Sequence, residues 1–325
     1  MKKFLKYLGY SLGVVLITVA ALLSYVKIAL PDVGAAPDMK VDVSAAKLER
    51  GKYLANHVML CMDCHSTRDW NQFSGPLVPG SEGKGGELFD QKLGFPGKYI
   101  APNITPYNLQ HWSDGELFRS ITEGVTKDGR ALFPIMPYHL FGQLDRNDIE
   151  AVIAYIRNLK PIESVQETSS SDFPMNFIIN TMPEKATLSK MPPKSDTLNY
   201  GKYMITASGC MDCHTKQEQG KFVGQLYAGG FEIKLPDGSV VRSANLTPDK
   251  ESGIGNWSKN YFIKRFKMYA DSAYVNPVVK PGDFQTIMPW TMYAGMDTVD
   301  LAAIYKYLKH LDPVYHVVEK FTPVN

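Results

Sequence analysis

The sequence Cys61-Met62-Asp63-Cys64-His65 occurs a second time, unchanged, as Cys210-Met211-Asp212-Cys213-His214. A Cys-x-x-Cys-His run is the attachment signature of a c-type haem. On one helical turn the two thiols face the same way and can form thioethers with the haem vinyl groups, while the adjacent His reaches the iron. The two motifs use all 4 cysteines of the chain. The sequence therefore predicts two covalently bound haem c groups, held by Cys61, Cys64, Cys210 and Cys213, with His65 and His214 as iron ligands.

Two other uses of paired cysteines fit this pattern less well. Structural zinc sites combine Cys pairs that are typically about 15–20 residues apart, whereas Cys64 and Cys210 are 146 positions apart. A thioredoxin-like redox pair needs one Cys-x-x-Cys near a βαβ pattern and has no need of the His. The repeated His favours haem over both. Asp63 and Asp212, inside the motifs, are expected to be solvated side chains.

Length and composition are those of a globular protein. The chain of 325 residues is long enough for two domains of ordinary size. Its 44% apolar and 21% charged residues allow a packed core. The formal charge of +2 is too small to favour nucleic acid as a partner. Cysteine usage indicates the compartment only through haem attachment, which in bacteria takes place on the outer side of the inner membrane.

Residues 1–30 are predicted to be an amino-terminal membrane anchor. Lysines precede a nearly uncharged run of 20 residues from Tyr7 to Val26. A helix of that length spans the hydrocarbon core, and the basic flank places the amino end inside and the rest of the chain outside. A cleaved signal peptide is the alternative, with Val33-Gly34-Ala35 as a tolerable cleavage site, although its apolar region is usually shorter. Residues 31–45 are expected to be a short tether.

From about residue 46 the sequence aligns with itself, so that it contains two repeats of about 115 residues. Four short motifs recur in the same order, and each copy ends in an amphipathic helix stopped by Pro. The matched segments are Gly51-Lys52-Tyr53 with Gly201-Lys202-Tyr203, Asn103-Ile104-Thr105-Pro106 with Asn245-Leu246-Thr247-Pro248, His111-Trp112-Ser113 with Asn256-Trp257-Ser258, Met136-Pro137 with Met288-Pro289, and the helix from Asp148 to Leu159 with that from Asp300 to Leu311.

The copies differ mainly in loop length. Between the Cys motif and Asn-x-Thr-Pro the first copy is longer, with 39 positions against 32. Between the Trp and Met-Pro the second copy is longer, with 31 positions against 24. Insertions in surface loops cost little entropy, so that one fold accommodates both copies. We expect two mostly helical haem domains, residues 46–161 and 197–315.

The remaining segments are a linker and a tail. Residues 162–196 form the linker, which is rich in Ser, Pro and Lys. An apolar stretch from Phe173 to Met182 interrupts it; this stretch is too short and too polar to span a membrane and is expected to pack along one of the domains. Residues 316–325 are expected to be a carboxyl-terminal tail.

A second protein ligand would occupy the sixth coordination position of each haem iron. A haem bound only by His has an open site for peroxide or oxygen, whereas a second ligand favours electron transfer. The candidate is the Met before Pro in each copy, because Met136 lies 71 residues after His65 and Met288 lies 74 after His214. A thioether stabilises ferrous iron and so raises the reduction potential. We therefore predict His/Met ligation at both sites.

Other Met and His residues compete for this role. Most Met side chains fill cores, and it is the matching position before Pro that distinguishes Met136 and Met288. Met292 and Met296 are close enough in sequence to replace Met288. Five His residues are rival nitrogen ligands, but they do not recur at equivalent positions and are expected to be ordinary polar or surface residues: His57, His111, His139, His310 and His316.

These motifs, with Gly253-Ile254-Gly255-Asn256-Trp257 and the linker segment Phe173-Pro174-Met175-Asn176, resemble the cytochrome c subunits of bacterial membrane-bound alcohol, aldehyde and gluconate dehydrogenases. The resemblance covers most of residues 46–313. It implies covalent haems, Met before Pro as distal ligand, an outward-facing location, and electron delivery from a catalytic subunit towards quinone or another cytochrome. Those subunits typically carry three haem motifs and an anchor near the carboxyl end, whereas this chain has two motifs and its apolar run at the amino end.

The expectation from the sequence is a mainly α protein with two tandem class I cytochrome c-like domains behind an N-terminal transmembrane helix. It would sit in the bacterial inner membrane with the haem domains in the periplasm. It would pass electrons between a respiratory dehydrogenase, or a quinol-oxidising partner, and a downstream acceptor such as an oxidase or another cytochrome. No catalysis of its own is expected.

Two other functions are weighed against this one. A dihaem peroxidase-type enzyme needs one haem with an open or displaceable sixth position, and Met-Pro in both copies argues against it. A haem-based sensor would need a signalling domain, and neither end of the chain contains a recognisable one.

Overall fold

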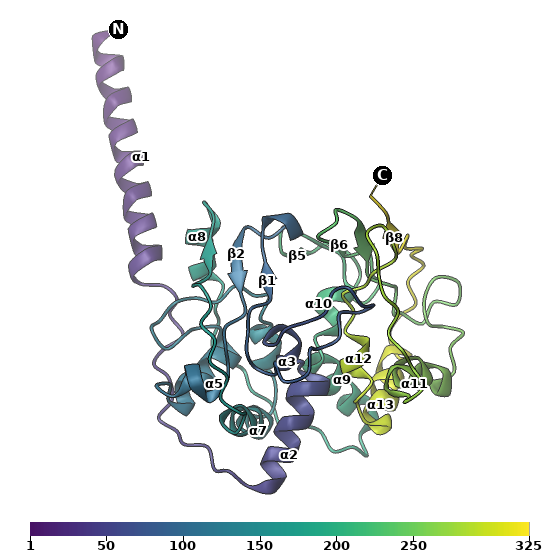
Figure 1. Ribbon diagram of the computed structural model, residues 1–325. Helices are drawn as coiled ribbons and strands as arrows, with labels where there is room; N and C mark the ends of the chain where they lie inside the picture. Colours follow the sequence, from purple (N-terminus) through teal and green to yellow (C-terminus); the bar gives the residue numbers. More distant parts are fainter. Residues whose placement is uncertain (325) are drawn as a thin grey trace.

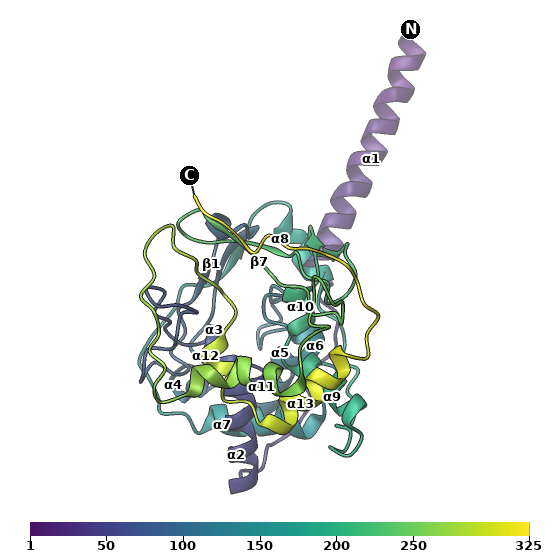
Figure 2. The same cartoon turned by 90° about the vertical axis from the view of Figure 1, so that its right-hand side faces the viewer.

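The structure is a computed structural model that describes residues 1–324. Helix α1 (Lys2–Ile28) projects away from the rest of the molecule (Figures 1 and 2). None of its residues is buried, and its most apolar 18-residue window has a mean hydropathy of 2.0. Within residues 1–324 it is the one helix long and apolar enough to cross a bilayer. The apolar helix predicted at the amino end is therefore present.

The body is mainly helical, and its elements follow the two sequence repeats. The first repeat contains α2 (Ala45–Tyr53), a π-helical turn η1 (Leu54–Val58), α3 (Cys61–Cys64), β1 (Leu88–Phe89), η2 (Gln91–Leu93), β2 (Gly97–Ile100), α4 (Pro106–Leu109), α5 (Asp114–Glu123), α6 (Tyr138–Phe141) and α7 (Arg146–Arg157). The linker contains β3 (Ser170–Ser171), α8 (Met175–Ile178) and η3 (Ile179–Thr181).

The second repeat follows the same order of helices, except that α4 has no counterpart. It contains α9 (Thr197–Ala207), α10 (Cys210–His214), β4 (Gln217–Glu218), β5 (Lys221–Phe222), β6 (Glu232–Lys234), β7 (Val240–Arg242), α11 (Lys259–Lys267), η4 (Met268–Ala270), α12 (Trp290–Tyr293) and α13 (Thr298–Leu308), and the tail that follows contains β8 (Phe321–Thr322). The two predicted terminal helices are thus present as α7 and α13, and each begins about two residues earlier than the sequence suggested.

In each repeat the first helix packs on the last, α2 on α7 and α9 on α13. The contact is close because glycine lies at it: an added Cβ on Gly51 would be 1.9 Å from the Ala151 carbonyl oxygen, and one on Gly201 would be 2.1 Å from that of Ala303. The apolar faces of α7 and α13 join one continuous core that includes both repeats. The glycine of Gly-Lys-Tyr therefore serves helix packing, with the backbones too near for any side chain.

Each repeat also has a small antiparallel sheet of three strands, β1-β2-β3 in the first and β6-β7-β8 in the second. The third strand comes from outside the repeats as the sequence divides them: β3 belongs to the linker and β8 to the carboxyl-terminal tail. Ser171 pairs with Gly97, and Thr322 pairs with Val240. The linker therefore completes the sheet of the first repeat, and the tail completes the sheet of the second.

The extra residues of the two copies contact each other. Gln72, in the longer loop of the first repeat, forms a β-bridge with Val278 in the longer loop of the second. The buried Gln285 donates through Nε2 to the carbonyls of Trp70 and Gln72, at 3.1 and 3.0 Å, and accepts the Ser74 N–H through Oε1 at 2.9 Å. The difference in loop length between the repeats is thus used to build their interface.

Reciprocal hydrogen bonds join the repeats at the start of their last helices. The Tyr53 hydroxyl donates to Asp300 Oδ2 at 2.6 Å, and the Tyr203 hydroxyl donates to Asp148 Oδ2 at 2.7 Å. Each phenol oxygen also accepts the backbone N–H three positions before the carboxylate, at 2.9 and 3.0 Å. Buried carboxylates need such donors. The Gly-Lys-Tyr motif therefore packs on its own repeat through Gly and binds the other repeat through Tyr.

The chain between α1 and α2 runs along α5 without regular structure. The Val41 N–H donates to Asp114 Oδ2 at 2.8 Å, and Val41 itself is buried. Gly115 allows this approach, because an added Cβ would be 1.7 Å from the Pro37 carbonyl oxygen. The segment expected to be a tether is packed on the body over part of its length.

Candidate functional site

Each Cys motif forms a single helical turn, α3 in the first repeat and α10 in the second. The residue before each turn lies in the left-handed region, Leu60 at φ 54° and Gly209 at φ 63°. Positions three apart on a helix share a face, so that the two sulfurs of each motif lie on one side of the turn. All four cysteines are free and none is fully buried. The thiols are therefore paired in space, accessible, and available for covalent attachment.

The two His side chains are held in the same way. The Nδ1–H group of His65 donates to the Pro102 carbonyl at 2.8 Å, and that of His214 donates to the Ala244 carbonyl at 2.8 Å. In both copies the acceptor immediately precedes Asn-x-Thr-Pro. This bond defines the tautomer and leaves Nε2 as the free nitrogen. Desolvation lowers the pKa of both imidazoles, against the opposing effect of the Nδ1 bond, which favours the neutral form that a metal needs.

A Gly-Gly pair, which the sequence analysis missed, positions these acceptors. The Gly85 N–H donates to the His65 carbonyl at 2.9 Å, and the Gly229 N–H donates to the His214 carbonyl at 2.8 Å. Both glycines have positive φ, +77° and +74°. An added Cβ on Gly85 would be 2.5 Å from the carbonyl carbon of Pro102, and one on Gly229 would be 2.6 Å from that of Ala244. The recurrence of Gly-Gly before Asn-x-Thr-Pro was the signal in the sequence.

Asn103 and Asn245 cap turns. The Oδ1 of each accepts both the N–H and the hydroxyl of the Thr two residues later, at 2.8–2.9 Å. The Nδ2 of Asn103 donates to the carbonyls of Ile162 and Ser164, and that of Asn245 donates to the Val314 carbonyl and the Ser252 hydroxyl. The amides are thus bonded to protein partners, as expected for an Asx turn. They fasten the linker to the first repeat and the segment after α13 to the second.

The two Met-Pro turns have the same backbone conformation. The carbonyl of Met136 accepts the Tyr138 N–H at 2.8 Å, and the carbonyl of Met288 accepts the Trp290 N–H at 2.8 Å. The prolines have φ −79° and −80°, and each starts a four-residue helix, α6 or α12. Both Met side chains are partly exposed at the edge of the core. The repeats therefore present Met in matching positions.

The rival ligands have other roles. Met292 and Met296 are buried in the core, with 6% and 1% of their surface exposed. His57 Nδ1 lies 2.9 Å from the Met292 carbonyl, and His316 Nδ1 lies 2.8 Å from the Ala228 carbonyl. These His side chains are fastened to backbone carbonyls in different parts of the fold and have no repeat-related counterparts.

Of the acidic residues inside the motifs, Asp63 is buried, contrary to the expectation, and Asp212 is half-buried. Asp63 is 9% exposed and pairs with Arg68, whose Nη1 lies 3.0 Å from Oδ2 and whose guanidinium stacks 4.0 Å above the Trp70 ring. Burial raises the pKa of Asp63, and Arg68 opposes that rise. Asp212 pairs with His139 of the other repeat at 3.1 Å. The reason is tertiary: the loop that carries Arg68 and the helix that carries His139 both cover these positions.

The two motifs lie close together across the boundary between the repeats. The buried Tyr293 donates its hydroxyl to the Ser208 carbonyl at 2.5 Å. Burial raises the pKa of Tyr293 well above its usual range, and groups of both motifs, Cys210 and Cys64 among them, raise it further. Turns α3 and α10 accordingly lie near the middle of the body (Figure 1).

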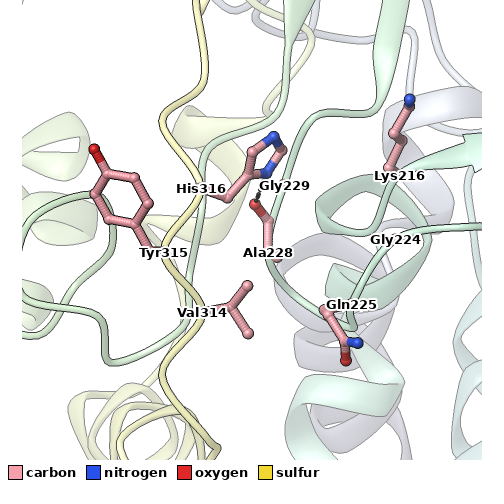
Figure 3. Close-up of a pocket in the computed structure, with 8 residues that line it drawn as sticks. All are labelled: Lys216, Gly224, Gln225, Ala228, Gly229, Val314, Tyr315 and His316. Carbon is pink, nitrogen blue, oxygen red and sulfur yellow. Dashed lines mark hydrogen bonds between the residues drawn. The ribbon is translucent and has the colours of Figure 1, made fainter.

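A zinc cluster and the hollow drawn in Figure 3 are two alternatives to these sites. Within residues 1–324 no three His, Cys, Asp or Glu side chains meet as a metal site. The hollow drawn in Figure 3 has a volume of about 240 Å³, below the usual range of ligand pockets, and contains none of the candidate ligands. In its lining the Nδ1–H group of His316 donates to the Ala228 carbonyl at 2.8 Å, next to Gly229 (Figure 3). At the equivalent place in the first repeat, Gln166 Nε2 of the linker donates to the Lys84 carbonyl, next to Gly85, at 3.0 Å.

Several curated proteins are similar to this chain in sequence. The chain is 26% identical over 289 residues to the cytochrome c subunit of the quinone-dependent alcohol dehydrogenase of Gluconacetobacter polyoxogenes, a match that covers 84% of this chain and 58% of that protein. It is 26% identical over 266 residues to the fructose dehydrogenase cytochrome subunit of Gluconobacter japonicus, covering 77% of this chain and 51% of that protein.

A third relative is the gluconate 2-dehydrogenase cytochrome c subunit of Pantoea cypripedii, 24% identical over 283 residues, with 82% of this chain and 60% of that protein covered. No protein-family model matches the chain. The chain thus spans less than two thirds of the length of these curated relatives. The resemblance found in the sequence is confirmed, because these relatives are cytochrome c subunits of dehydrogenases.

Proposed function

We propose that this protein is a membrane-anchored dihaem cytochrome c, with two tandem class I cytochrome c-like domains behind α1. It passes electrons between a dehydrogenase, or a quinol-oxidising partner, and a downstream acceptor. One haem is held by Cys61, Cys64, His65 and Met136, and the other by Cys210, Cys213, His214 and Met288. The chain contributes ligation and burial and carries out no catalysis of its own.

The main support for this proposal is that the two His side chains are oriented by equivalent hydrogen bonds. In each repeat a backbone carbonyl accepts the Nδ1–H group at 2.8 Å, so that Nε2 is the nitrogen left for iron. The same turn presents two accessible thiols on one side. Haem c, when bound, supplies the one-electron chemistry of iron. The carbonyl acceptors orient the rings and increase the basicity of the ligands.

The closeness of the two motifs favours electron exchange between the sites. Besides burial, charged groups of both motifs raise the pKa of Tyr293, so that both motifs lie near it. Asp212 of one repeat also pairs with His139 of the other. The reciprocal Tyr–Asp bonds and the joined loops hold the repeats in one orientation. A rigid pair of neighbouring sites is what a two-centre electron carrier requires.

The location and partner follow from α1 and the relatives. The lysines before its apolar run favour the amino end in the cytoplasm and the haem domains in the periplasm of a bacterial inner membrane. The relatives' names favour a dehydrogenase catalytic subunit as the electron donor. Extraction in mild detergent through a carboxyl-terminal tag, with mass spectrometry of the co-purified chains, tests this: a catalytic subunit supports the proposal, and a stoichiometric complex without a redox protein contradicts it.

The haem content is tested by counting. The intact mass of the purified chain and its pyridine haemochrome are expected to give two haems per chain. Cys61→Ala/Cys64→Ala is expected to give one, because each pair of thioethers holds one haem independently. Cys210→Ala/Cys213→Ala is the matched variant in the other repeat. A mass without haem, or loss of both haems from either variant, would contradict two separate attachment sites.

Replacing Met136 or Met288 by Ala is expected to remove the thioether–iron charge-transfer band of one haem and to lower the potential of that haem, because a Met ligand favours ferrous iron. Met292→Ala is the control; it removes a core side chain and should cost stability while leaving the band intact. The band is measured in the oxidised protein. If Met136→Ala and Met288→Ala both keep the full band, the sixth ligands are wrong, and peroxide turnover would then favour the peroxidase alternative.

Ser74 belongs to the first repeat but is expected to affect the second haem. Its hydroxyl donates to the Met288 carbonyl at 2.6 Å and accepts the Trp290 N–H at 3.0 Å. In Ser74→Ala the Met288 carbonyl still accepts the Trp290 N–H at 2.8 Å, so that the loss is that of the two hydroxyl bonds, about 1 kcal/mol. The band of the second haem should weaken or shift, and that of the first should stay unchanged. Ser81→Ala, a buried serine bonded only within the first repeat, is the matched control, and equal effects of the two variants would contradict the proposed link.

A further inference from the structure

The linker returns to the end of α1. Lys27 Nζ donates to the Asn176 carbonyl of α8 at 2.6 Å and lies 4.9 Å from the centre of the Phe177 ring. Asn180 Nδ2 donates to the Val26 carbonyl at 3.4 Å. Residues about 150 positions apart in the chain are thus brought together, and α8 lies beside the base of α1 in both views (Figures 1 and 2).

The height of this contact along α1 coincides with the end of its apolar run. The run from Tyr7 to Val26 has 20 residues, which at about 1.5 Å each make about 30 Å, the thickness of a hydrocarbon core. Val26 is therefore at the core boundary, and Lys27 is at the level where basic side chains reach the headgroups. Because Lys27 is hydrogen-bonded to α8 and Val26 to Asn180 of η3, this part of the linker lies at the same depth.

The outer side of this segment is apolar. Phe173 is 78% exposed and Ile178 is 43% exposed. Residues 173–183 contain no charged side chain, whereas the flanking linker is charged, with Asp172 before and Glu184 and Lys185 after. Leaving a large apolar side chain in water instead of burying it forgoes about 1.5–3 kcal/mol. An uncharged segment with exposed Phe and Ile next to the end of a membrane helix is the composition of an interfacial anchor.

We propose that residues 173–182 insert into the outer interface of the bilayer, with Phe173 and Ile178 among the upper acyl chains. The inference rests on the proposed membrane anchoring by α1 and adds a second contact between the protein and lipid. The segment 29–44 is also packed on α5, so that the body cannot swing freely about α1. The face that carries α8 therefore lies against the membrane, and the opposite end, with α2 and α7, points away from it (Figure 1).

Photo-crosslinking of the full chain in lipid nanodiscs of phosphatidylcholine and phosphatidylglycerol tests this contact. The photoreactive residue p-benzoylphenylalanine is introduced separately at three positions, and lipid adducts are measured by mass spectrometry. Val15, on α1, reports the anchor itself. Phe173 reports the proposed contact. Leu188, an apolar linker residue with 37% of its surface exposed, is the matched control, because its neighbour Ser189 is bonded to the Gln143 carbonyl near the start of α7.

The proposal expects lipid adducts at positions 15 and 173, with about tenfold more adduct at 173 than at 188. Adducts at 15 together with equal, low yields at 173 and 188 would overturn the interfacial contact and leave the anchored cytochrome intact. A chain that does not co-elute with the nanodiscs, or that gives no adduct at position 15, would overturn the anchor and the interfacial contact together. The measurement does not depend on haem, so that the three outcomes remain distinct.

Discussion

Gly85→Ala is expected to lower the free energy of unfolding by about 3 kcal/mol and to disturb the first haem. Alanine at φ +77° costs about 1–2 kcal/mol. The added Cβ would also be 2.5 Å from the carbonyl carbon of Pro102, so that either the Gly-Gly turn or the Pro102 segment must move. Pro102 supplies the acceptor for His65 Nδ1. Its displacement should make the imidazole less basic and raise the potential of the first haem.

Gly80→Ala is the matched control for this variant. Gly80 has φ +82°, and nothing lies within 4 Å of a Cβ built there. It therefore carries the backbone cost of about 1–2 kcal/mol without the collision. Urea denaturation gives the stability difference, and a redox titration with spectral separation of the two haems gives the potentials. If Gly85→Ala and Gly80→Ala have the same stability and the same haem potentials, the close approach at Gly85 is not required for stability or for positioning Pro102.

The second repeat offers the same comparison. Gly229→Ala brings a Cβ to 2.6 Å from the carbonyl carbon of Ala244, whereas Gly220, at φ +74°, has open space around it. The effects should move from the first haem to the second. An effect of Gly229→Ala on the first haem alone would contradict the assignment of each Gly-Gly pair to its own site.

Asp300→Ala is expected to lower the free energy of unfolding by about 3 kcal/mol. The carboxylate has no exposed surface. It accepts the Tyr200 hydroxyl at 2.8 Å from its own repeat and the Tyr53 hydroxyl at 2.6 Å from the other. Removing it leaves two phenols without their acceptor and opens a cavity between α9 and α13. Because one of the lost bonds crosses the boundary, the repeats should also unfold less cooperatively, with a broader urea transition.

A double-mutant cycle separates the free energy of the Tyr53–Asp300 contact between the repeats from the other effects of removing Asp300. Tyr53→Phe alone should cost about 1 kcal/mol, and its effect should be about 1 kcal/mol smaller in the Asp300→Ala background. Asp312→Ala, an exposed carboxylate, is the control and should change stability by less than about 0.5 kcal/mol. Strict additivity of the first two substitutions would mean that the Tyr53–Asp300 bond contributes nothing to the interface.

The sequence was most informative where chemistry and structure are local. The Cys-x-x-Cys-His spacing defines single turns that present both thiols on one side. The apolar periodicity before Pro161 and Pro313 predicted the ends of α7 and α13 to within about three residues. The long uncharged run predicted α1. These features depend on spacing within a few turns of chain, which a sequence contains in full.

Contacts between residues far apart in the chain could not be predicted from the sequence. Asp63 was expected in solvent, yet the loop that carries Arg68 covers it. Nothing in the sequence indicates that the extra residues of the two copies meet, or that the Tyr of each Gly-Lys-Tyr binds the carboxylate of the other repeat. The Gly-Gly pairs were visible as a repeat, but their meaning depends on how near the Pro102 and Ala244 carbonyls come.

By itself, then, the sequence determined two equivalent cofactor motifs, their order within two repeats, and an apolar helix at the amino end, because each depends on residue types at short spacing. Tertiary structure alone decided which carbonyls orient His65 and His214, how the unequal loops lock the repeats together, and that the linker returns to the base of α1. The physical reason is that these arrangements depend on close approach between segments that lie tens to hundreds of residues apart. Packing density and hydrogen-bond satisfaction select such approaches only when the whole chain is folded.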